Sequence, residues 1–150
     1  MDRRRPPDGV APVAAQVMYS LLDRSPEREL APACVRFGLS IVPYAPLHGG
    51  LLADLAVLDR EIAGGKRYGG PGYSEKEIAV ARELERLARE WGFGMQQVSL
   101  AWLLSRPAVA SVIMGAETVD EVRANALAAD VELTPEQLNA ISALTDDTIS

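Results

Sequence analysis

Two apolar runs of strand length lie near the start of the chain, at residues 13–20 and 39–45. The segment between them begins Ser25-Pro26-Glu27, which is typical of a helix start because it combines a capping hydroxyl, a first-turn proline and an acid at the positive helix end. Gly38 then provides a left-handed helix exit. Apolar residues recur at helical spacing in between: Leu30, Cys34 and Phe37. A strand, a helix and a second strand in this order predict parallel pairing.

Capping boxes of the form Ser/Thr-x-x-Glu/Gln mark helix starts in the second half: Ser74 with Glu77, Thr118 with Glu121, and Thr134 with Gln137. They predict helices from 75 to near Gly92, from 119 to about 129, and from 135 onward. Gly94 is expected to begin a further helix that Pro107 ends. The positions expected to face the core recur at helical spacing: Ile78, Ala81, Leu84 and Ala88; Val98, Ala101, Trp102 and Leu104; Leu138, Ile141 and Leu144.

Residues 109–116 form a third apolar run, which we expect to be a strand. The predicted fold class is therefore α/β, with about three parallel strands and flanking helices. Three strands cannot close a barrel, and open sheet edges indicate that the chain is part of something larger. We expect a disordered lead-in over 1–12, a glycine-rich, mobile excursion over 53–73, and one domain over 13–150.

Charge and composition exclude several classes of protein. The net charge of −6 and the pI near 4.8 give no basic surface for nucleic acid. No apolar run approaches the roughly 18 residues that a membrane span requires, and residues 1–10 lack the apolar core of a secretory signal. The lone cysteine, Cys34, and the absence of metal-ligand spacing favour neither a disulfide nor a metal site. We expect a cytoplasmic protein with no nucleic acid or membrane partner.

The stretch 41–52 is the strongest candidate for a binding element. An apolar strand pattern ends at Tyr44, and prolines and glycines follow it. Ligands of parallel α/β proteins bind at the carboxyl ends of strands, where Tyr44 would offer an aromatic face and glycines would let the backbone approach. The alternative for Tyr44 is a core aromatic at a strand end. His48, the sole histidine, is expected to be a solvated loop residue rather than a general base.

Three segments of the chain occur in the order and at the spacing of one enzyme family. They are Gln16-Val17-Met18-Tyr19-Ser20-Leu21-Leu22-Asp23-Arg24, then Val42-Pro43-Tyr44-Ala45-Pro46-Leu47 with Gly49-Gly50-Leu51-Leu52, and finally Leu100-Ala101-Trp102-Leu103-Leu104 with Val112-Ile113-Met114-Gly115-Ala116 and Asn125. On these residues the chain resembles the C-terminal half of an aldo-keto reductase, with strands six to eight of the barrel. The resemblance implies a partial TIM-type (β/α)8 barrel and NADP(H)-dependent reduction of an aldehyde or ketone.

The resemblance also assigns roles in cofactor binding. Gln16 would hydrogen-bond the nicotinamide carboxamide, and Tyr44 would stack on the nicotinamide ring. The pyrophosphate would lie along a loop whose small side chains let backbone amides approach: Ala45, Pro46, Leu47 and Gly49. The adenosine end would lie against a second set, with its last member near the adenine: Gly115, Ala116, Glu117, Glu121 and Asn125.

The chain departs from the family pattern at the catalytic residues and at several cofactor-binding positions. The family's catalytic Asp, Tyr, Lys and His lie on earlier strands that have no counterpart in this sequence, so we assign no catalytic residue. Glu117 stands where many relatives have an arginine for the 2′-phosphate. Its charge would repel that phosphate, which makes NAD(H) the alternative to NADP(H). Glu121 replaces a common glutamine and Ala124 an acid near the adenine, so the predicted cofactor site is partial.

Three functions follow from this resemblance. The first is an oxidoreductase that reduces a small-molecule carbonyl substrate: an aldo-keto reductase polypeptide that is expected to be either truncated at its start or completed by a second chain that carries the N-terminal half. The second is a non-catalytic remnant that acts as a nucleotide-binding module or as an interaction module that self-associates through its open barrel edges. The third is a decayed fragment without function.

Overall fold

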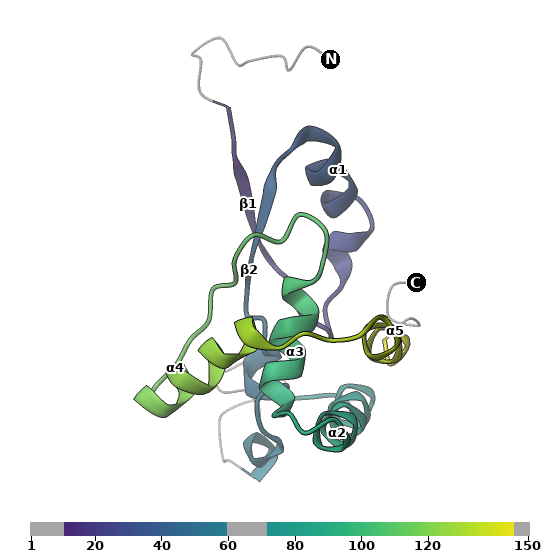
Figure 1. The fold of residues 1–150 in the computed structure, drawn as a ribbon, viewed down its shortest axis with the longest axis vertical. Helices are drawn as coiled ribbons and strands as arrows, with labels where there is room; N and C mark the ends of the chain where they lie inside the picture. Colours follow the sequence, from purple (N-terminus) through teal and green to yellow (C-terminus); the bar gives the residue numbers. More distant parts are fainter. Residues whose placement is uncertain (1–10, 60–71, 146–150) are drawn as a thin grey trace.

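The computed structural model describes residues 11–59 and 72–145 (Figure 1). Its strands and α-helices follow in this order: β1 (Ala14–Met18), α1 (Leu30–Phe37), β2 (Ser40–Tyr44), α2 (Glu75–Glu90), α3 (Met95–Leu104), α4 (Val119–Ala126) and α5 (Pro135–Ala143). The lead-in expected over 1–12 and residues 60–71 of the expected excursion fall almost entirely outside the described residues. The described start of that excursion is packed rather than mobile, because it contains the 3-10 helix Leu55–Asp59 with Val57 buried.

The two strands pair in parallel, as the order of elements predicted. Gln16 lies opposite Val42 and Met18 opposite Tyr44, and α1 makes the crossover beside them (Figure 1). Side chains alternate between the two faces of the sheet, and the face that carries Ile41 is buried against the core. On the opposite face the side chains of β1 are exposed at every second position.

The third strand predicted over 109–116 is wrong except for a single bridge between Val109 and Ile41. The Ile41 N–H donates to the Ala108 carbonyl at 2.6 Å, and the Ala110 N–H donates to the Ile41 carbonyl at 3.1 Å. A regular parallel ladder would next use the N–H of Pro43, which proline lacks. The Ile113 N–H reaches the Pro43 carbonyl at 2.8 Å, one residue later than the ladder requires. The segment therefore follows β2 without forming a strand.

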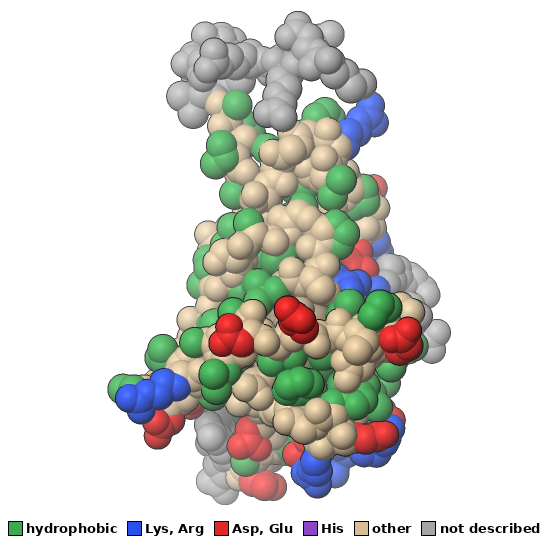
Figure 2. All heavy atoms as spheres, in the orientation of Figure 1, with side chains coloured by type: hydrophobic (Ala, Val, Ile, Leu, Met, Phe, Trp, Pro, Cys, Tyr) green, Lys and Arg blue, Asp and Glu red, His purple; other side chains and the backbone are tan. Residues whose placement is uncertain are grey.

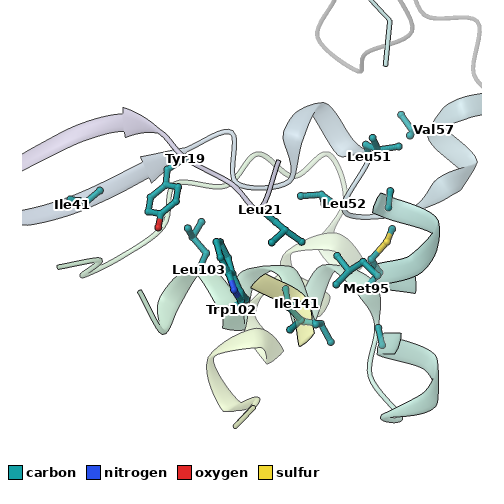
Figure 3. Close-up of a cluster of buried hydrophobic side chains, with 14 of the residues drawn as sticks. Tyr19, Leu21, Ile41, Leu51, Leu52, Val57, Met95, Trp102, Leu103 and Ile141 are labelled. Carbon is teal, nitrogen blue, oxygen red and sulfur yellow. The ribbon is translucent and has the colours of Figure 1, made fainter. Parts of the chain in front are cut away.

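Trp102 of α3 lies at the centre of the hydrophobic core, with no exposed surface. Its ring meets Tyr19 edge-to-face at 6.3 Å between centroids, and its Nε1 donates to the Ser142 hydroxyl at 3.0 Å. Figure 3 shows the neighbouring apolar side chains converging from the loop after β2, from α3 and from α5: Leu51, Leu52, Met95, Leu103 and Ile141. The core thus lies between the helices and the buried face of the sheet.

One position expected in the core is exposed, and so is an apolar residue at helical spacing on α1. Leu104 is 37% exposed, and Leu103 is buried in its place, because α3 is enclosed over most of its circumference except near its end. Phe37, at the last turn of α1, is 57% exposed, with the Arg36 guanidinium 5.7 Å from its ring centroid.

A buried polar network joins the start of the chain to its last helix. Arg24 donates twice to the Glu27 carboxylate, at 3.1 and 2.8 Å, and also to the Ser142 carbonyl at 3.0 Å and the Thr145 hydroxyl at 3.1 Å. The Tyr19 hydroxyl donates to the same carboxylate at 2.7 Å. Burial, together with the Glu27 carboxylate, raises the pKa of Tyr19 well above its usual range.

Some of the helix starts predicted from the sequence are confirmed, and one is wrong. The capping boxes at Ser74 and Thr134 are present, and Gly38 exits α1 with φ 66°. The start predicted at Ser25 is wrong: residues Ser25–Glu27 form only a 3-10 turn, and the Ser25 hydroxyl donates to Asp23 Oδ1 at 2.7 Å instead of capping a helix. Within the described ranges, no helix has the length and apolar content needed to cross a bilayer.

Candidate functional site

The exposed face of the sheet carries the two residues expected to hold a nicotinamide ring. Gln16 and Tyr44 lie on the same face because Gln16 pairs with Val42 and side chains alternate along a strand. Tyr44 ends β2 and is 42% exposed, and Met18 opposite it is 43% exposed. The structure therefore presents an aromatic ring and an amide side by side on an open, partly apolar surface.

The loop after Tyr44 has an unusual backbone. Ala45, His48, Gly49 and Gly50 all have positive φ, at 51°, 48°, 67° and 101°. Two of them are not glycine, and such residues persist in this conformation only where the surroundings impose it. The His48 and Gly50 N–H groups donate to the Ala45 and Leu47 carbonyls of the same loop, at 3.1 and 3.0 Å, which leaves the Leu47 and Gly49 N–H groups for an anionic ligand.

Contacts from the start of α2 hold this loop in place. His48 Nε2 lies 2.5 Å from Glu77 Oε1, and the Tyr73 hydroxyl donates to the Gly49 carbonyl at 2.7 Å. The His48 side chain is only 13% exposed, so the expectation of a solvated loop residue is wrong. Burial would raise the pKa of Glu77, but hydrogen bonds from the Ser74 backbone and hydroxyl and from His48 outweigh it and hold that pKa below its usual range.

A cavity of about 440 Å³ adjoins this loop. Four residues from the predicted cofactor set line it: Leu47, Gly115, Glu121 and Asn125. The other seven do not line it. Gln16 and Tyr44 lie on the open sheet face, Pro46 is buried, and the Gly49 carbonyl is bound by Tyr73. The remaining three are exposed at the surface: Ala45, Ala116 and Glu117. Segments far apart in the sequence thus converge on one hollow whose volume suits a small ligand.

Sequence analysis missed most of the cavity wall. The additional lining residues come from Gly50 and the loop after it, from the last turns of α2 and from the start of α3: Gly50, Ala53, Asp54, Val57, Glu85, Arg89, Phe93, Gly94, Met95 and Gln96. Ala124 of α4, which the sequence had placed near the adenine, also lines the cavity. Glu85 and Arg89 belong to the polar face of α2, which by sequence is indistinguishable from a solvated surface. Only the packing of α2 against α3 shows that this face borders a cavity.

Asn125 is the most informative residue in the cavity wall. Its side chain belongs to α4 and the residue is 8% exposed. Its side-chain amide makes no hydrogen bond within the described residues, and because no fully enclosed side-chain nitrogen or oxygen there lacks a partner, the amide is accessible from the cavity that it lines. An amide in this position can donate to one ligand atom and accept from another.

The first turn of α4 differs from the capping box predicted there. The Thr118 hydroxyl accepts from the Glu121 N–H at 3.1 Å, as expected. The Glu121 carboxylate, however, accepts from the backbone N–H of Glu117 at 2.7 Å. A capping box would use the backbone N–H of Thr118, one residue later. This carboxylate lines the cavity while it is held at the positive end of the helix dipole.

In the described part of the chain, no three His, Cys, Asp or Glu residues are grouped as metal ligands. Cys34 is buried in the core, on the inner face of α1. The site therefore offers hydrogen-bonding amides, a strained loop and an aromatic surface. These features serve to bind and orient a ligand.

Comparison with known proteins shows the family of the chain. The model of the aldo/keto reductase family matches residues 6–146. The chain is 36% identical over 139 residues to the uncharacterized oxidoreductase YqkF of Bacillus subtilis, covering 91% of this chain and 44% of that protein. It is 30% identical over 123 residues to the NADH-specific methylglyoxal reductase of Escherichia coli, covering 79% of this chain and 37% of that protein.

Among solved structures, a thermostable aldo-keto reductase, Tm1743, in complex with the inhibitor epalrestat, superposes with a TM-score of 0.66 at 31% identity. The match covers 88% of this chain and 39% of that one. The chain spans about two fifths of the length of the relatives that it matches. Sequence and fold both assign this chain to the aldo/keto reductase family.

Proposed function

We propose that this chain is the cofactor-binding part of an aldo-keto reductase that reduces an aldehyde or ketone with a nicotinamide dinucleotide. Members of the family generally use nicotinamide cofactors; the resemblance gives NADP(H), with NAD(H) as the alternative. The observation that carries the proposal is the 440 Å³ cavity, where Leu47, Gly115, Glu121 and Asn125 meet although up to 78 residues separate them in sequence. Four of the eleven residues chosen from the sequence for binding one ligand line one hollow of suitable volume.

The described residues fit such a cofactor in three places. Asn125, whose amide lines the cavity and is not hydrogen-bonded within the described residues, would bond the adenine there. In the loop from Ala45 to Gly50, the N–H groups of His48 and Gly50 are bonded within the loop, so the pyrophosphate would use the remaining amides, such as those of Leu47 and Gly49. Gln16 would bond the nicotinamide carboxamide, and Tyr44 would support the ring on the open sheet face.

A bound dinucleotide would supply or accept the hydride, and the residues of this chain would orient it. Tyr44 fixes which side of the ring is covered by protein and which is left for a carbonyl substrate. The family's proton-donating tetrad has no counterpart among these residues, so in the proposed enzyme another part of the barrel supplies it. The exposed face of β1, which carries Gln16 and the 43% exposed Met18, is the surface that this part would cover.

A fluorescence titration of the purified chain with NADH and NADPH tests the proposal, with Trp91 and Trp102 as reporters and the reduced cofactor as a second signal. We expect saturable binding of at least one dinucleotide that weakens about tenfold in Tyr44→Ala, the loss expected from one stacked ring. Phe37→Ala is the matched control, because Phe37 is an exposed aromatic on α1 outside the site. A folded chain that binds neither dinucleotide would contradict the proposal.

A second candidate is an interaction module that self-associates, and exposed apolar residues favour it. They gather on the sheet, on the segment after Val109, and on α4 and the residue that follows it. Helix α4 projects from the body of the molecule (Figure 1). The residues are Met18, Tyr44, Ile113, Met114, Val119, Val122 and Leu127. Figure 2 shows hydrophobic side chains at the surface of the narrow part formed by β1, β2 and α1. Sedimentation equilibrium distinguishes the candidates: a monomer at every concentration excludes self-association, and an oligomer that Val122→Lys dissociates supports it.

A further inference from the structure

The loop after β2 is strained in its middle, while both of its ends are fixed. Ala45 and His48 are not glycine, but their φ angles are 51° and 48°, a conformation that such residues keep only where their surroundings impose it. Strand β2 fixes the start of the loop, and Leu51 and Leu52, which have no exposed surface, fix its end. The conformation of residues 45–50 therefore depends on the contacts made between these two ends.

Within the described ranges, two side-chain contacts of hydrogen-bond length reach this part of the loop from outside it, and both come from the start of α2. His48 Nε2 lies 2.5 Å from Glu77 Oε1, and the Tyr73 hydroxyl donates to the Gly49 carbonyl at 2.7 Å. The rings of Tyr73 and His48 also lie near one another, with 6.4 Å between their centroids. We call these four residues, two on the loop and two at the start of α2, the clasp.

Glu77 joins the clasp to the capping box of α2. Its Oε2 accepts from the Ser74 N–H at 2.6 Å and from the Ser74 hydroxyl at 2.8 Å, while its Oε1 faces His48. Burial opposes ionisation of this carboxyl, but the hydrogen bonds outweigh it and keep its pKa below its usual range. Because an ionised carboxylate only accepts hydrogen bonds, the proton of this contact lies on His48 Nε2. The imidazole therefore donates a charge-assisted hydrogen bond to the first turn of α2.

We propose that the clasp holds the loop after β2 in the conformation that binds its ligand, with Glu77 and Tyr73 as positioning residues. The inference rests on the function proposed above, in which the Leu47 and Gly49 N–H groups meet the pyrophosphate of a dinucleotide. Leu47 also lines the cavity, so a loop without the clasp would have a different cavity wall. A chain whose loop has left this conformation must restore it on binding, which lowers its apparent affinity.

Amide hydrogen exchange of the full chain without ligand, followed by NMR, tests the clasp independently of any cofactor. The reporters are the amides of His48 and Gly50, which donate to carbonyls within the loop. His48→Ala keeps a Cβ and therefore the strain at this position, so it removes the contact alone. We expect exchange about tenfold faster in His48→Ala and in Glu77→Ala, and no faster in the double variant than in His48→Ala, because both substitutions remove one contact.

Two milder variants keep the test informative if an alanine variant fails to fold. His48→Gln retains a side-chain N–H that can donate to Glu77, so it should recover most of the wild-type protection against exchange. A side chain that only fills space would show no such recovery. Tyr73→Phe removes the hydroxyl bound to Gly49 and should speed exchange by a smaller factor, about fivefold, because that hydrogen bond involves no charge.

Two controls separate the clasp from the rest of the first turn of α2. Glu75→Ala removes an exposed carboxylate from the same turn, and Ser74→Ala removes the cap while the Glu77 carboxylate stays in place. Each should change exchange in the loop by less than about twofold. Exchange that is equally fast in the wild type, His48→Ala and Glu77→Ala would overturn the inference and leave the proposed function standing. Controls that match Glu77→Ala would overturn it as well, because the cap or the charge would then be the cause.

Isothermal titration calorimetry with NADH and NADPH then connects the clasp to the ligand. We expect Glu77→Ala to weaken dinucleotide binding about tenfold and Glu75→Ala to leave it unchanged, because only the first variant depopulates the binding conformation. An unchanged affinity in a Glu77→Ala chain whose loop exchanges faster would overturn the positioning role alone. A folded wild-type chain that binds neither dinucleotide would overturn the proposed function and the positioning role with it.

Discussion

Replacing Arg24 with methionine should destabilise the chain strongly. The arginine is the centre of the hydrogen-bond network that joins the segment before α1 to the end of α5. The side chain is 7% exposed and donates to Glu27, the Ser142 carbonyl and the Thr145 hydroxyl. Its guanidinium also lies 5.4 Å from the centroid of the Trp102 ring. Methionine fills a similar volume, so the change removes charge and hydrogen bonds with little loss of packing.

The magnitude follows from what is left behind. Glu27 would keep one partner, Tyr19, in a site where its side chain is 21% exposed. Breaking a fully buried pair costs about 3–5 kcal/mol; partial exposure of Glu27 lowers our expectation to about 2–4 kcal/mol. For a chain of this length, that loss corresponds to a fall in Tm of roughly 5–15 °C.

Urea unfolding followed by tryptophan fluorescence measures this change. The matched control is Arg86→Met, because Arg86 pairs with Glu83 and Glu90 on the solvent face of α2, where its side chain is 57% exposed. The control should unfold at the wild-type urea concentration. If Arg24→Met costs less than about 1 kcal/mol, the network does not hold the ends together and the reasoning fails.

The same variant has a defined pH dependence. Burial would raise the pKa of Glu27, but hydrogen bonds from Arg24 and Tyr19 outweigh it and lower that pKa. A lowered folded-state pKa means that the stabilisation is complete above the unfolded carboxyl value and is lost as pH falls through the folded value. The difference between wild type and Arg24→Met should therefore narrow on acidification below about pH 4.5, and a constant difference would contradict the assignment.

Three further predictions concern single elements of the fold. Trp102→Ala, at the centre of the core, should lower the free energy of unfolding in urea by about 3–5 kcal/mol. A loss below about 1 kcal/mol would show that Trp102 is not central to the packing of the core. Ser74→Ala removes the cap of α2 and should cost about 1 kcal/mol, measured by thermal melting in far-UV circular dichroism; an unchanged Tm would contradict the cap. Because hydrogen bonds from Ser74 and His48 lower the pKa of Glu77, Glu77→Gln should flatten the acid limb of the stability curve, and an unaltered limb would refute this role.

Local signals in the sequence predicted the elements whose formation depends on their own residues. Gly38 supplies the left-handed exit of α1, and the capping boxes at Ser74 and Thr134 begin their helices, because each motif satisfies backbone groups within a few residues. The parallel pairing of β1 with β2 followed from the helix between them.

Features that depend on distant partners could not be predicted in this way. The run after Ala108 has strand composition, but Pro43 on its neighbour lacks the N–H that a ladder needs. The placement of His48 depends on its contact with Glu77, which lies 29 residues later in the sequence. In the same way, hydrophobic periodicity places Arg89 on the polar face of α2, but it does not indicate that this face borders a cavity.

The central claim is that the adenosine end of a dinucleotide lies in the cavity between the loop after β2, the start of α3 and α4. The most direct test is a map of backbone amide chemical shifts of the isotopically labelled chain, recorded during titration with NADH. The account predicts saturable shifts centred on Leu47, Gly115 and Asn125, which line the cavity, and their loss in Asn125→Ala. Shifts centred on α1, or none in a chain whose spectrum shows a folded protein, would contradict it.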